Sequence, residues 1–297
     1  GEKINATISI ANNDKIKEVF RTGNCNLGRL WKYLTLLLCM KPDEHEYKVM
    51  GLAPYSDRNY SNKVNNLLKK NFQIVKGHNF VNVGKTKDIY FSFKKIFEPF
   101  RFDNIAGGLQ IYTEEIVTKW IKFAIKKYRI NRVVFSGGVS MNIKLNKCIS
   151  EIKSIRNFYV PASGGDESLA LGNYYNVFGG PKTKYFDNIY LGPEYNDKQI
   201  LSSIKKMKKK NYIIKKNVSN KVVAQYLAKG YIGARFSGKM EFGARALGNR
   251  SIIADPSKIE VLKKINKQIK NRDFWMPFTP TILDKSLKRY IKNPKKI

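Results

Sequence analysis

Two stretches, RVVFSGGVSMN (residues 132–142) and NFYVPASGGDE (residues 157–167), decide the fold class of this chain. Each begins with a short run typical of a strand, passes through a glycine pair and leads into a helical pattern. Such a unit presents free backbone N–H groups at the start of its helix, where anions bind, and ligands of open α/β sheets bind at these strand ends. One glycine pair is typical of any tight turn, but two in tandem favour a nucleotide site.

The residues before this region predict strands followed by helices. ATISIA (6–11) alternates as a half-buried strand does, and IKEVF (16–20) can pair back onto it as a hairpin. Helical patterns cover residues 27–40, 61–72 and 103–128, and Ser61 is the expected cap of the second helix.

A boundary is predicted at FGGPKTK (178–184), because Gly-Gly-Pro interrupts the pattern. We therefore expect domains at residues 1–180 and 188–297, with an α/β fold overall that becomes α+β in the second domain. The expected helices there are 197–209, 219–229 and 257–270, and the expected strands are 211–215, the buried run YIGARF (231–236) and the start of SIIADP (251–256). NRDFWMPFTPTIL (271–283) is expected to be extended.

The stretch KMEFGARALGNRS (239–251) places Lys239, Arg245 and Arg250 among glycines, directly after a predicted strand. Arginine offers a planar fork that matches phosphate, lysine adds a point charge, and glycine lets the backbone approach a ligand. These residue types in this spacing predict an anion site. Glu241 either orients one of the arginines or forms an ordinary, partly exposed ion pair.

Composition excludes several classes of protein. With 42% hydrophobic and 12% aromatic residues, the 297-residue chain can build real cores and is not of the disordered type. Its longest apolar run, LLLCM (36–40), is far shorter than a membrane span, and the absence of a visible signal peptide makes a cytoplasmic location the expectation. Three cysteines without CxxC spacing are expected to be reduced thiols.

The formal net charge of +33 has two interpretations. A concentrated basic face would indicate a nucleic-acid partner. The charge here is mostly lysine spread along the chain, as in KKMKKKN (205–211), which favours a lysine-rich proteome. Binding to tRNA or another polyanion stays open as the less favoured alternative.

Five motifs occur in an order that resembles the O-carbamoyltransferases of the nodulation and antibiotic-tailoring type. They are EYKVMGLAPY (46–55), SGGVSMNIKLN (136–146), SGGDESLALG (163–172), KMEFGARALGNRSIIADP (239–256) and NRDFWMPFTP (271–280). The resemblance covers nearly the whole chain. It implies two modules: the second lobe of an ASKHA (actin-like ATPase) fold, followed by a YrdC-like domain.

The resemblance also implies a reaction. The YrdC-like module joins carbamoyl phosphate to ATP, giving carbamoyl adenylate and pyrophosphate, and the ASKHA-like module passes the carbamoyl group to a hydroxyl of a small-molecule or saccharide acceptor. ATP is the implied cofactor, and carbamoyl phosphate and the hydroxyl acceptor are the implied partners. No membrane partner is expected.

Site residues follow from the matching motifs. The resemblance implies that Lys239, Arg245, Arg250, Lys270 and Arg272 act on phosphate groups. The implied nucleotide-binding residues are Glu46, Gly137, Gly138, Asn142, Gly164 and Gly165. Each has a simpler structural interpretation: Asn142 can be a helix cap, Glu46 a surface carboxylate, and the cations near residue 270 a decorated helix end.

Asp166 matches the metal-ligand aspartate of the resembling family, which holds an iron-type or other divalent ion, with Mg also possible. The two histidines of that metal site belong to a lobe that we expect this chain to lack, and His45 and His78 lie in no matching motif and are expected at the surface. The ligand set is therefore incomplete. Alone, the chain is expected to bind nucleotide poorly and not to complete the transfer.

The chain also departs from the family pattern at three positions. Ala244 replaces a proline, Met276 replaces an arginine and Ser56 replaces a glycine. Three interpretations stay open: a two-module carbamoyltransferase without its N-terminal lobe and C-terminal tail, a tRNA threonylcarbamoyladenosine-type modification enzyme, and an inactive fragment that binds nucleotide. The fusion of both modules in one chain favours the first.

Overall fold

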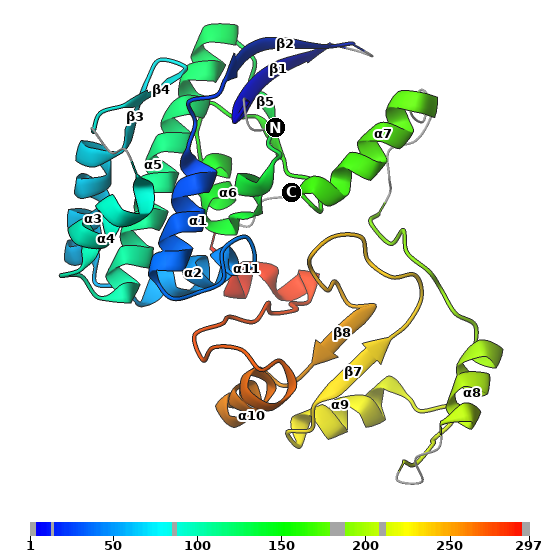
Figure 1. Ribbon diagram of the computed structural model, residues 1–297. Helices are drawn as coiled ribbons and strands as arrows, with labels where there is room; N and C mark the ends of the chain where they lie inside the picture. Colours follow the sequence, from blue (N-terminus) through cyan, green and yellow to red (C-terminus); the bar gives the residue numbers. More distant parts are fainter. Residues whose placement is uncertain (1–3, 13–14, 85–87, 179–187, 208–211, 293–297) are drawn as a thin grey trace. The chain divides into compact units, whose positions relative to one another are not determined.

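The computed structural model describes residues 4–12, 15–84, 88–178, 188–207 and 212–292 (Figure 1). These residues form two units. The first contains the described residues up to Asp166 together with Trp275–Pro277, and the second contains Glu167–Phe274 and Phe278–Lys292. Both mix helices with small sheets, and no helix of the described residues combines the length and apolarity of a membrane span.

The first unit is built around helix α5, which runs from Phe102 to Tyr128. Its other helices are α1 (Leu27–Leu37), α2 (Glu46–Leu52), α3 (Arg58–Asn71), α4 (Ile89–Phe97) and α6 (Ile143–Ser150), with short 3-10 turns η1 (Ala53–Tyr55) and η2 (Gly138–Met141). Its strands are β1 (Ala6–Asn12), β2 (Lys15–Thr22), β3 (Gln73–Lys76), β4 (Asn79–Asn82), β5 (Arg132–Val134) and β6 (Asn157–Tyr159).

Helices α3 and α5 pack closely because α5 carries two consecutive glycines at the contact. A Cβ atom on Gly108 would lie 2.4 Å from Val64 of α3, and one on Gly107 would lie 2.1 Å from the Ser56 hydroxyl. The fully buried side chains Val64, Leu68, Leu109 and Tyr112 fill this contact. Ser56, which replaces a glycine of the family pattern, is therefore part of the core packing.

Among the described residues, three of the four sheets are antiparallel pairs, and β5 pairs with β6 in parallel. The parallel register joins Arg132 to Asn157, Val133 to Phe158 and Val134 to Tyr159. This pair confirms the two predicted strands and brings both of their carboxyl ends to one edge. The mixed α/β class is thus confirmed, with small two-stranded sheets.

The second unit has shorter elements. They are α7 (Leu169–Phe178), α8 (Asp197–Lys206), α9 (Asn220–Ala228), β7 (Gly233–Phe236), β8 (Arg250–Ile253), α10 (Ile259–Lys264), the π-helical turn η4 (Ile265–Ile269), η5 (Asp284–Ser286) and α11 (Leu287–Tyr290). A 3-10 turn η3 (Asp166–Ser168) lies at the boundary of the units. Of its described hydrophobic residues, only Val261 and Ile265 are buried.

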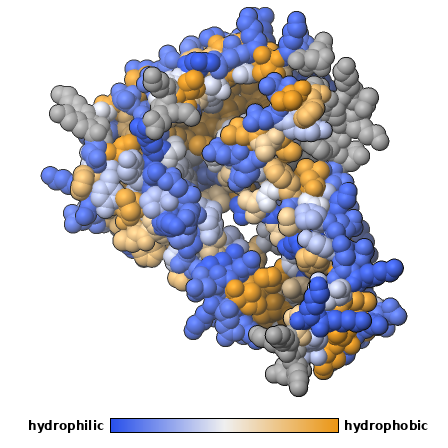
Figure 2. All heavy atoms as spheres, turned by 45° about the vertical axis from the view of Figure 1, so that its right-hand side comes forward, coloured by the Kyte–Doolittle hydropathy of each residue, from blue (hydrophilic) through white to orange (hydrophobic). Residues whose placement is uncertain are grey.

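The surface carries many exposed apolar side chains among hydrophilic ones (Figure 2). In the second unit, Ile213 is 86% exposed and Phe274 is 79% exposed. The organised core of the chain therefore lies in the first unit, and the second unit is held mainly by backbone and side-chain hydrogen bonds.

Some local predictions were wrong. Asp57, not Ser61, caps α3, because its carboxylate accepts the N–H groups of Asn59 and Tyr60 while Ser61 is fully buried. Residues 212–215 form no strand, and residue 211 lies outside the described residues. The run 231–236 contains β7, but its side chains are half-buried or exposed, not buried.

Candidate functional site

The loop that joins β7 to β8 contains the predicted cations. The two strands pair with Phe236 opposite Arg250, and the loop closes at its base where the Ser237 N–H donates to the Asn249 carbonyl at 3.0 Å. Three glycines in the loop have positive φ, a conformation that other residues rarely adopt: Gly238 (57°), Gly243 (107°) and Gly248 (109°). The backbone path of this loop therefore depends on glycine.

Glu241 is the organising side chain of the loop. It is 7% exposed, and its Oε1 accepts backbone N–H groups from Leu247 at 2.9 Å, Asn249 at 2.7 Å and Arg250 at 3.1 Å. Burial raises the pKa of this carboxyl, but backbone hydrogen bonds to it outweigh that effect and lower the pKa to about 2. Glu241 is thus ionised and satisfied by backbone N–H groups, and the ordinary ion pair that was one of its two expected roles does not form among the described residues.

Arg250 closes the loop from the other side. Its Nη1 donates to the carbonyls of Ser237 and Asn249, both at 3.0 Å, and its Nη2 donates to those of Gly238 at 3.0 Å and Pro193 at 3.1 Å. The guanidinium carbon also lies 3.7 Å from the centre of the Phe236 ring. Four of the five N–H donors of this guanidinium are therefore already used within the unit.

A segment that the sequence did not single out, residues 189–193, lies along the loop. The Met240 N–H donates to the Pro193 carbonyl at 3.2 Å, and the Gly192 N–H donates to the Met240 carbonyl at 2.9 Å. A Cβ on Gly192 would lie 2.8 Å from the Met240 Cβ, so only glycine permits this approach. The sequence LGP (191–193), a glycine followed by a proline, indicates a turn in this segment, but it does not indicate that the segment contacts the β7–β8 loop.

Unlike Arg250, Lys239 and Arg245 do not use their side chains to hold the loop in shape. Both are exposed, and neither side chain makes a hydrogen bond or ion pair with a residue that the structure describes. Only the backbone carbonyl of Lys239 is used, as an acceptor for the Asn249 side-chain amide at 2.8 Å. The loop thus presents two cations on a backbone that Glu241 and Arg250 hold in place.

The cations near residue 270 follow the π-helical turn η4. Lys270 is exposed at the end of this turn, and Arg272 donates through Nε to the Oδ1 of Asn266 at 2.5 Å. The Arg272 guanidinium also lies over the Phe278 ring, 4.6 Å from its centre. Lys270 is therefore accessible, whereas Arg272 is held by its neighbours.

The two glycine loops after β5 and β6 lie together in the first unit. Gly137 has a φ of 97°, and its N–H donates to the Gly164 carbonyl at 2.9 Å. A Cβ on Gly164 would lie 1.9 Å from the Ser140 hydroxyl and 3.1 Å from the Gly137 carbonyl oxygen, so a larger residue would be crowded at this position. Gly138 and Gly165 adjoin this contact between the two loops that the sequence singled out.

Asn142 and Glu46 both have structural roles at helix starts. The Asn142 Oδ1 accepts the Leu145 N–H at 3.0 Å as the cap of α6, and its amide pairs reciprocally with that of Gln110 at 2.9 and 3.2 Å. The Glu46 carboxylate accepts the Asp43 N–H at 2.8 Å at the first turn of α2. The contacts of both residues thus agree with their simpler structural interpretations and do not require a nucleotide.

The residues present do not fit a metal ion. Asp166 is exposed, and no group of three or more His, Cys, Asp or Glu side chains among the described residues could hold one. Both histidines, which the sequence placed at the surface, are half-buried there: His45 accepts the Lys41 N–H at 3.1 Å, and His78 packs edge-on against Phe20 with ring centres 4.5 Å apart. We derive no chemical step through a metal.

Met276, where the family pattern has arginine, is 7% exposed in the first unit. Its sulfur would lie 3.6 Å from a Cβ on Gly51 of α2, and the neighbouring Trp275 Nε1 donates to the Lys48 carbonyl at 3.3 Å. This position is therefore a packing residue here and supplies no cation.

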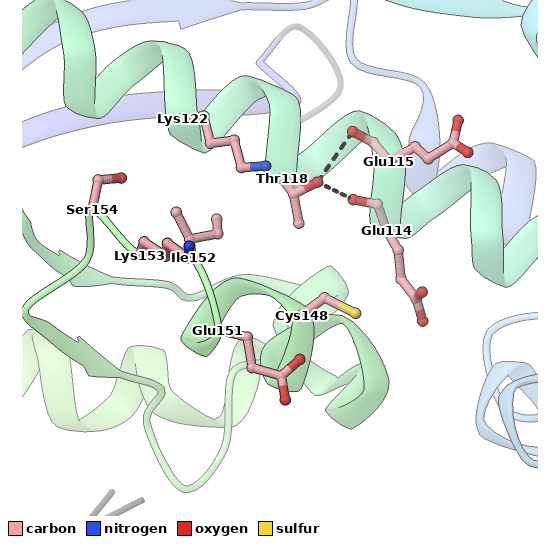
Figure 3. A pocket seen from close by; sticks show the side chains of 9 residues that line it. All are labelled: Glu114, Glu115, Thr118, Lys122, Cys148, Glu151, Ile152, Lys153 and Ser154. Atoms are coloured by element: carbon pink, nitrogen blue, oxygen red, sulfur yellow. Dashed lines mark hydrogen bonds between the residues drawn. The ribbon is translucent and has the colours of Figure 1, made fainter. Parts of the chain in front are cut away.

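A pocket of about 650 Å³ lies between α5 and the end of α6 (Figure 3). Its lining residues are Glu114, Glu115, Thr118, Lys122, Cys148, Glu151, Ile152, Lys153 and Ser154. The carboxylates already have partners: Gln110 for Glu114 (2.8 Å), Lys69 for Glu115 (2.9 Å) and Lys147 for Glu151 (3.2 Å). None of the predicted site residues lines this pocket, and its carboxylates are already paired with neighbouring side chains.

Comparisons with known proteins agree with the motif order. Residues 3–174 match the family model described as carbamoyltransferase N-terminus, and residues 224–296 match the one described as carbamoyltransferase C-terminus.

Individual relatives match over most of this chain. It is 30% identical to the uncharacterized protein MJ1058 of Methanocaldococcus jannaschii (93% of this chain, 47% of the relative) and 32% identical to MJ1051 of the same organism (99% and 58%). It is 26% identical to the nodulation protein NolO of Bradyrhizobium diazoefficiens (84% and 47%). The chain spans about half the length of the curated relatives it matches.

Proposed function

The chain belongs to the carbamoyltransferase family, and from this premise we propose that it takes part in ATP-dependent carbamoyl transfer. In this proposal the second unit activates carbamoyl phosphate with ATP as carbamoyl adenylate. The first unit then directs the carbamoyl group to a hydroxyl of a small-molecule or saccharide acceptor. For the two modules we keep the domains expected from the sequence as part of the proposal, an ASKHA-like lobe in residues 1–180 and a YrdC-like domain in residues 188–297.

The single observation that carries the proposal is the β7–β8 loop. Carbamoyl phosphate and the triphosphate of ATP are both strongly anionic, so bringing them together requires positive charge at a fixed place. Lys239 and Arg245 supply this charge on a loop whose backbone is held by internal hydrogen bonds. Because the backbone is held, both side chains extend from defined positions, which reduces the reorganisation needed when they meet developing charge.

The chemistry that these cations support is charge neutralisation. In a balanced reaction, water first cleaves carbamoyl phosphate to carbamate and phosphate, and a carbamate oxygen then attacks the α-phosphorus of ATP, so that carbamoyl adenylate forms and pyrophosphate leaves. Phosphate and pyrophosphate are both anions, and Arg245 can grip their oxygens through two parallel hydrogen bonds. Lys239 adds a point charge, and Lys270 and Arg272 are proposed as further phosphate contacts. In group transfer of this kind, positioning and electrostatic stabilisation are the main contributions of the protein.

In the first unit, the paired glycine loops are the proposed nucleotide site. Gly137, Gly138, Gly164 and Gly165 lie at the carboxyl ends of parallel strands, where α/β proteins bind ligands. Asn142 contributes by fixing the start of α6 beside these loops.

The test is carbamoyl-phosphate-dependent release of pyrophosphate from ATP by the 297-residue chain, a step that the second unit performs in this proposal and that does not require completed transfer to the acceptor. Arg245→Ala should reduce this rate by roughly 10- to 150-fold, since a charge-assisted hydrogen bond contributes ~1.5–3 kcal/mol. Arg235→Ala is the matched control, because Arg235 is an exposed arginine in the adjoining strand and should leave the rate unchanged. Wild-type release by Arg245→Ala would refute the assignment.

A tRNA-modifying role is the second candidate, favoured by the net charge of +33. Charge spread along the chain should give weak binding that ignores RNA sequence and is lost steeply with salt. Tight and selective tRNA binding at about 0.2 M salt would instead support this role.

A further inference from the structure

We propose that Glu241 is a positioning residue of the anion site, which shapes the β7–β8 loop so that Arg245 can bind phosphate. This inference deepens the proposed function and rests on it for the identity of the ligand. The loop contains a buried carboxylate, Glu241, although its cations are proposed to bind anions and a negative charge opposes that binding.

The contacts of Glu241 define the shape of the loop. Its hydrogen bond to the Leu247 N–H joins the two ends of the segment 242–246, and Arg245 lies exposed within this closed segment. Its bonds to the N–H groups of Asn249 and Arg250 tie the same carboxylate to the start of β8. One oxygen atom thus fixes where Arg245 lies relative to the strands.

Arg250 completes the frame by binding carbonyls rather than N–H groups. Its four hydrogen bonds join both ends of the loop to Pro193 on the flanking segment. A bidentate grip on phosphate would require breaking some of these bonds. We therefore assign Arg250 to loop positioning, and leave phosphate contact to Arg245 and Lys239.

Electrostatics and positioning predict opposite effects of removing Glu241. A negative charge near Arg245 and Lys239 opposes anion binding, so loss of the carboxylate would strengthen binding if charge alone mattered. If the carboxylate acts by shaping the loop, its loss leaves three backbone N–H groups without their acceptor, and binding weakens. The sign of the change therefore distinguishes the two explanations.

The experiment is isothermal titration of the full chain with inorganic pyrophosphate. Glu241→Ala should weaken binding by about tenfold, and Glu241→Gln, which keeps an acceptor oxygen, should weaken it less. Glu260→Ala is the matched control, because Glu260 is an exposed carboxylate of α10 in the same unit and its loss should not weaken binding. Circular dichroism checks that each variant is folded.

A double variant shows whether Glu241 acts through Arg245. If it does, Glu241→Ala combined with Arg245→Ala should bind pyrophosphate within about twofold of Arg245→Ala alone, because the two effects are not additive. Full additivity would indicate a general structural role and overturn the inference. Tighter binding by Glu241→Ala would also overturn it, and would show that the carboxylate occupies an anion site of the backbone.

Amide hydrogen exchange separates this inference from the proposed function. The N–H groups of Leu247, Asn249 and Arg250 should exchange faster in Glu241→Gln than in the wild type, whether or not pyrophosphate binds. Absence of pyrophosphate binding by the wild type would refute the proposed anion site, while faster exchange in the variant would still support the loop-shaping role. Unchanged exchange would overturn that role.

Discussion

Replacing Gly108 by alanine should destabilise the first unit, although alanine is the better helix former. A Cβ at this position would lie 2.4 Å from Val64 side-chain carbons and 2.8 Å from the Ser61 carbonyl oxygen. Ordinary carbon–carbon contacts are about 3.5–4.0 Å, so α3 and α5 would have to separate by roughly 1 Å. Because Val64 is fully buried, the helices cannot avoid this clash by a side-chain rotation into solvent.

The expected magnitude follows from two opposing terms. Overpacking a core costs ~1–3 kcal/mol, and the clash with backbone as well as side chain places this case near the upper end. The gain in helix propensity from glycine to alanine is about 1 kcal/mol. The free energy of unfolding should therefore fall by about 2 kcal/mol.

Urea denaturation followed by tryptophan fluorescence measures this change, because Trp31, Trp120 and Trp275 all lie in the first unit. Gly28→Ala is the control: nothing lies within 4 Å of its added Cβ, and it should be neutral or stabilise α1 by about 0.5 kcal/mol. If Gly108→Ala were as stable as the wild type, the close approach of α3 and α5 would be wrong.

Two further predictions concern the first unit. Asn142→Ala removes the cap of α6 and the amide pair with Gln110, so urea denaturation should show a loss of about 1–2 kcal/mol even without nucleotide; an unchanged unfolding free energy would contradict the capping role. Burial and the nearby Glu114 carboxylate raise the pKa of Cys148 to about 11, so iodoacetamide at pH 8 should label the exposed Cys39 long before Cys148, as mass spectrometry of peptides would show. Labelling of Cys148 should keep increasing toward pH 11, and equal rates at pH 8 would contradict its burial.

Local patterns were sufficient to predict much of the first unit. The hairpin of β1 and β2 and the long helix α5 followed from periodicity, because each depends on residues close in sequence, and strands β5 and β6 were recognised from the glycine turns that follow them. The cap of α3 was missed because Ser61 and Asp57 are both good capping residues. Only the packing of Ser61 against α5 distinguishes them.

The second unit was harder to predict because its contacts are distant in sequence. Arg250 could be identified as important from its place among glycines, but its bond to the Pro193 carbonyl spans 57 positions. The sequence left two roles open for Glu241, orienting an arginine or forming an ordinary ion pair. In the structure its carboxylate instead accepts hydrogen bonds from backbone N–H groups. Such bonds cannot be predicted from residue types, because the backbone N–H does not depend on the side chain. Residues 212–215 have strand-like composition but no partner strand in the described structure.

The proposed activation of a carbamoyl group on a nucleotide can be tested by identifying the reaction product. The chain would be incubated with ATP and carbamoyl phosphate labelled with ¹³C at the carbonyl, and the nucleotides separated and analysed by mass spectrometry. With the wild-type chain we expect AMP carrying the labelled carbamoyl group, formed together with pyrophosphate; Arg235→Ala should form it at the same rate, and Arg245→Ala should form it roughly 10- to 150-fold more slowly. Conversion of ATP to ADP without label on any nucleotide, or labelled product formed by Arg245→Ala at the wild-type rate, would refute the proposal.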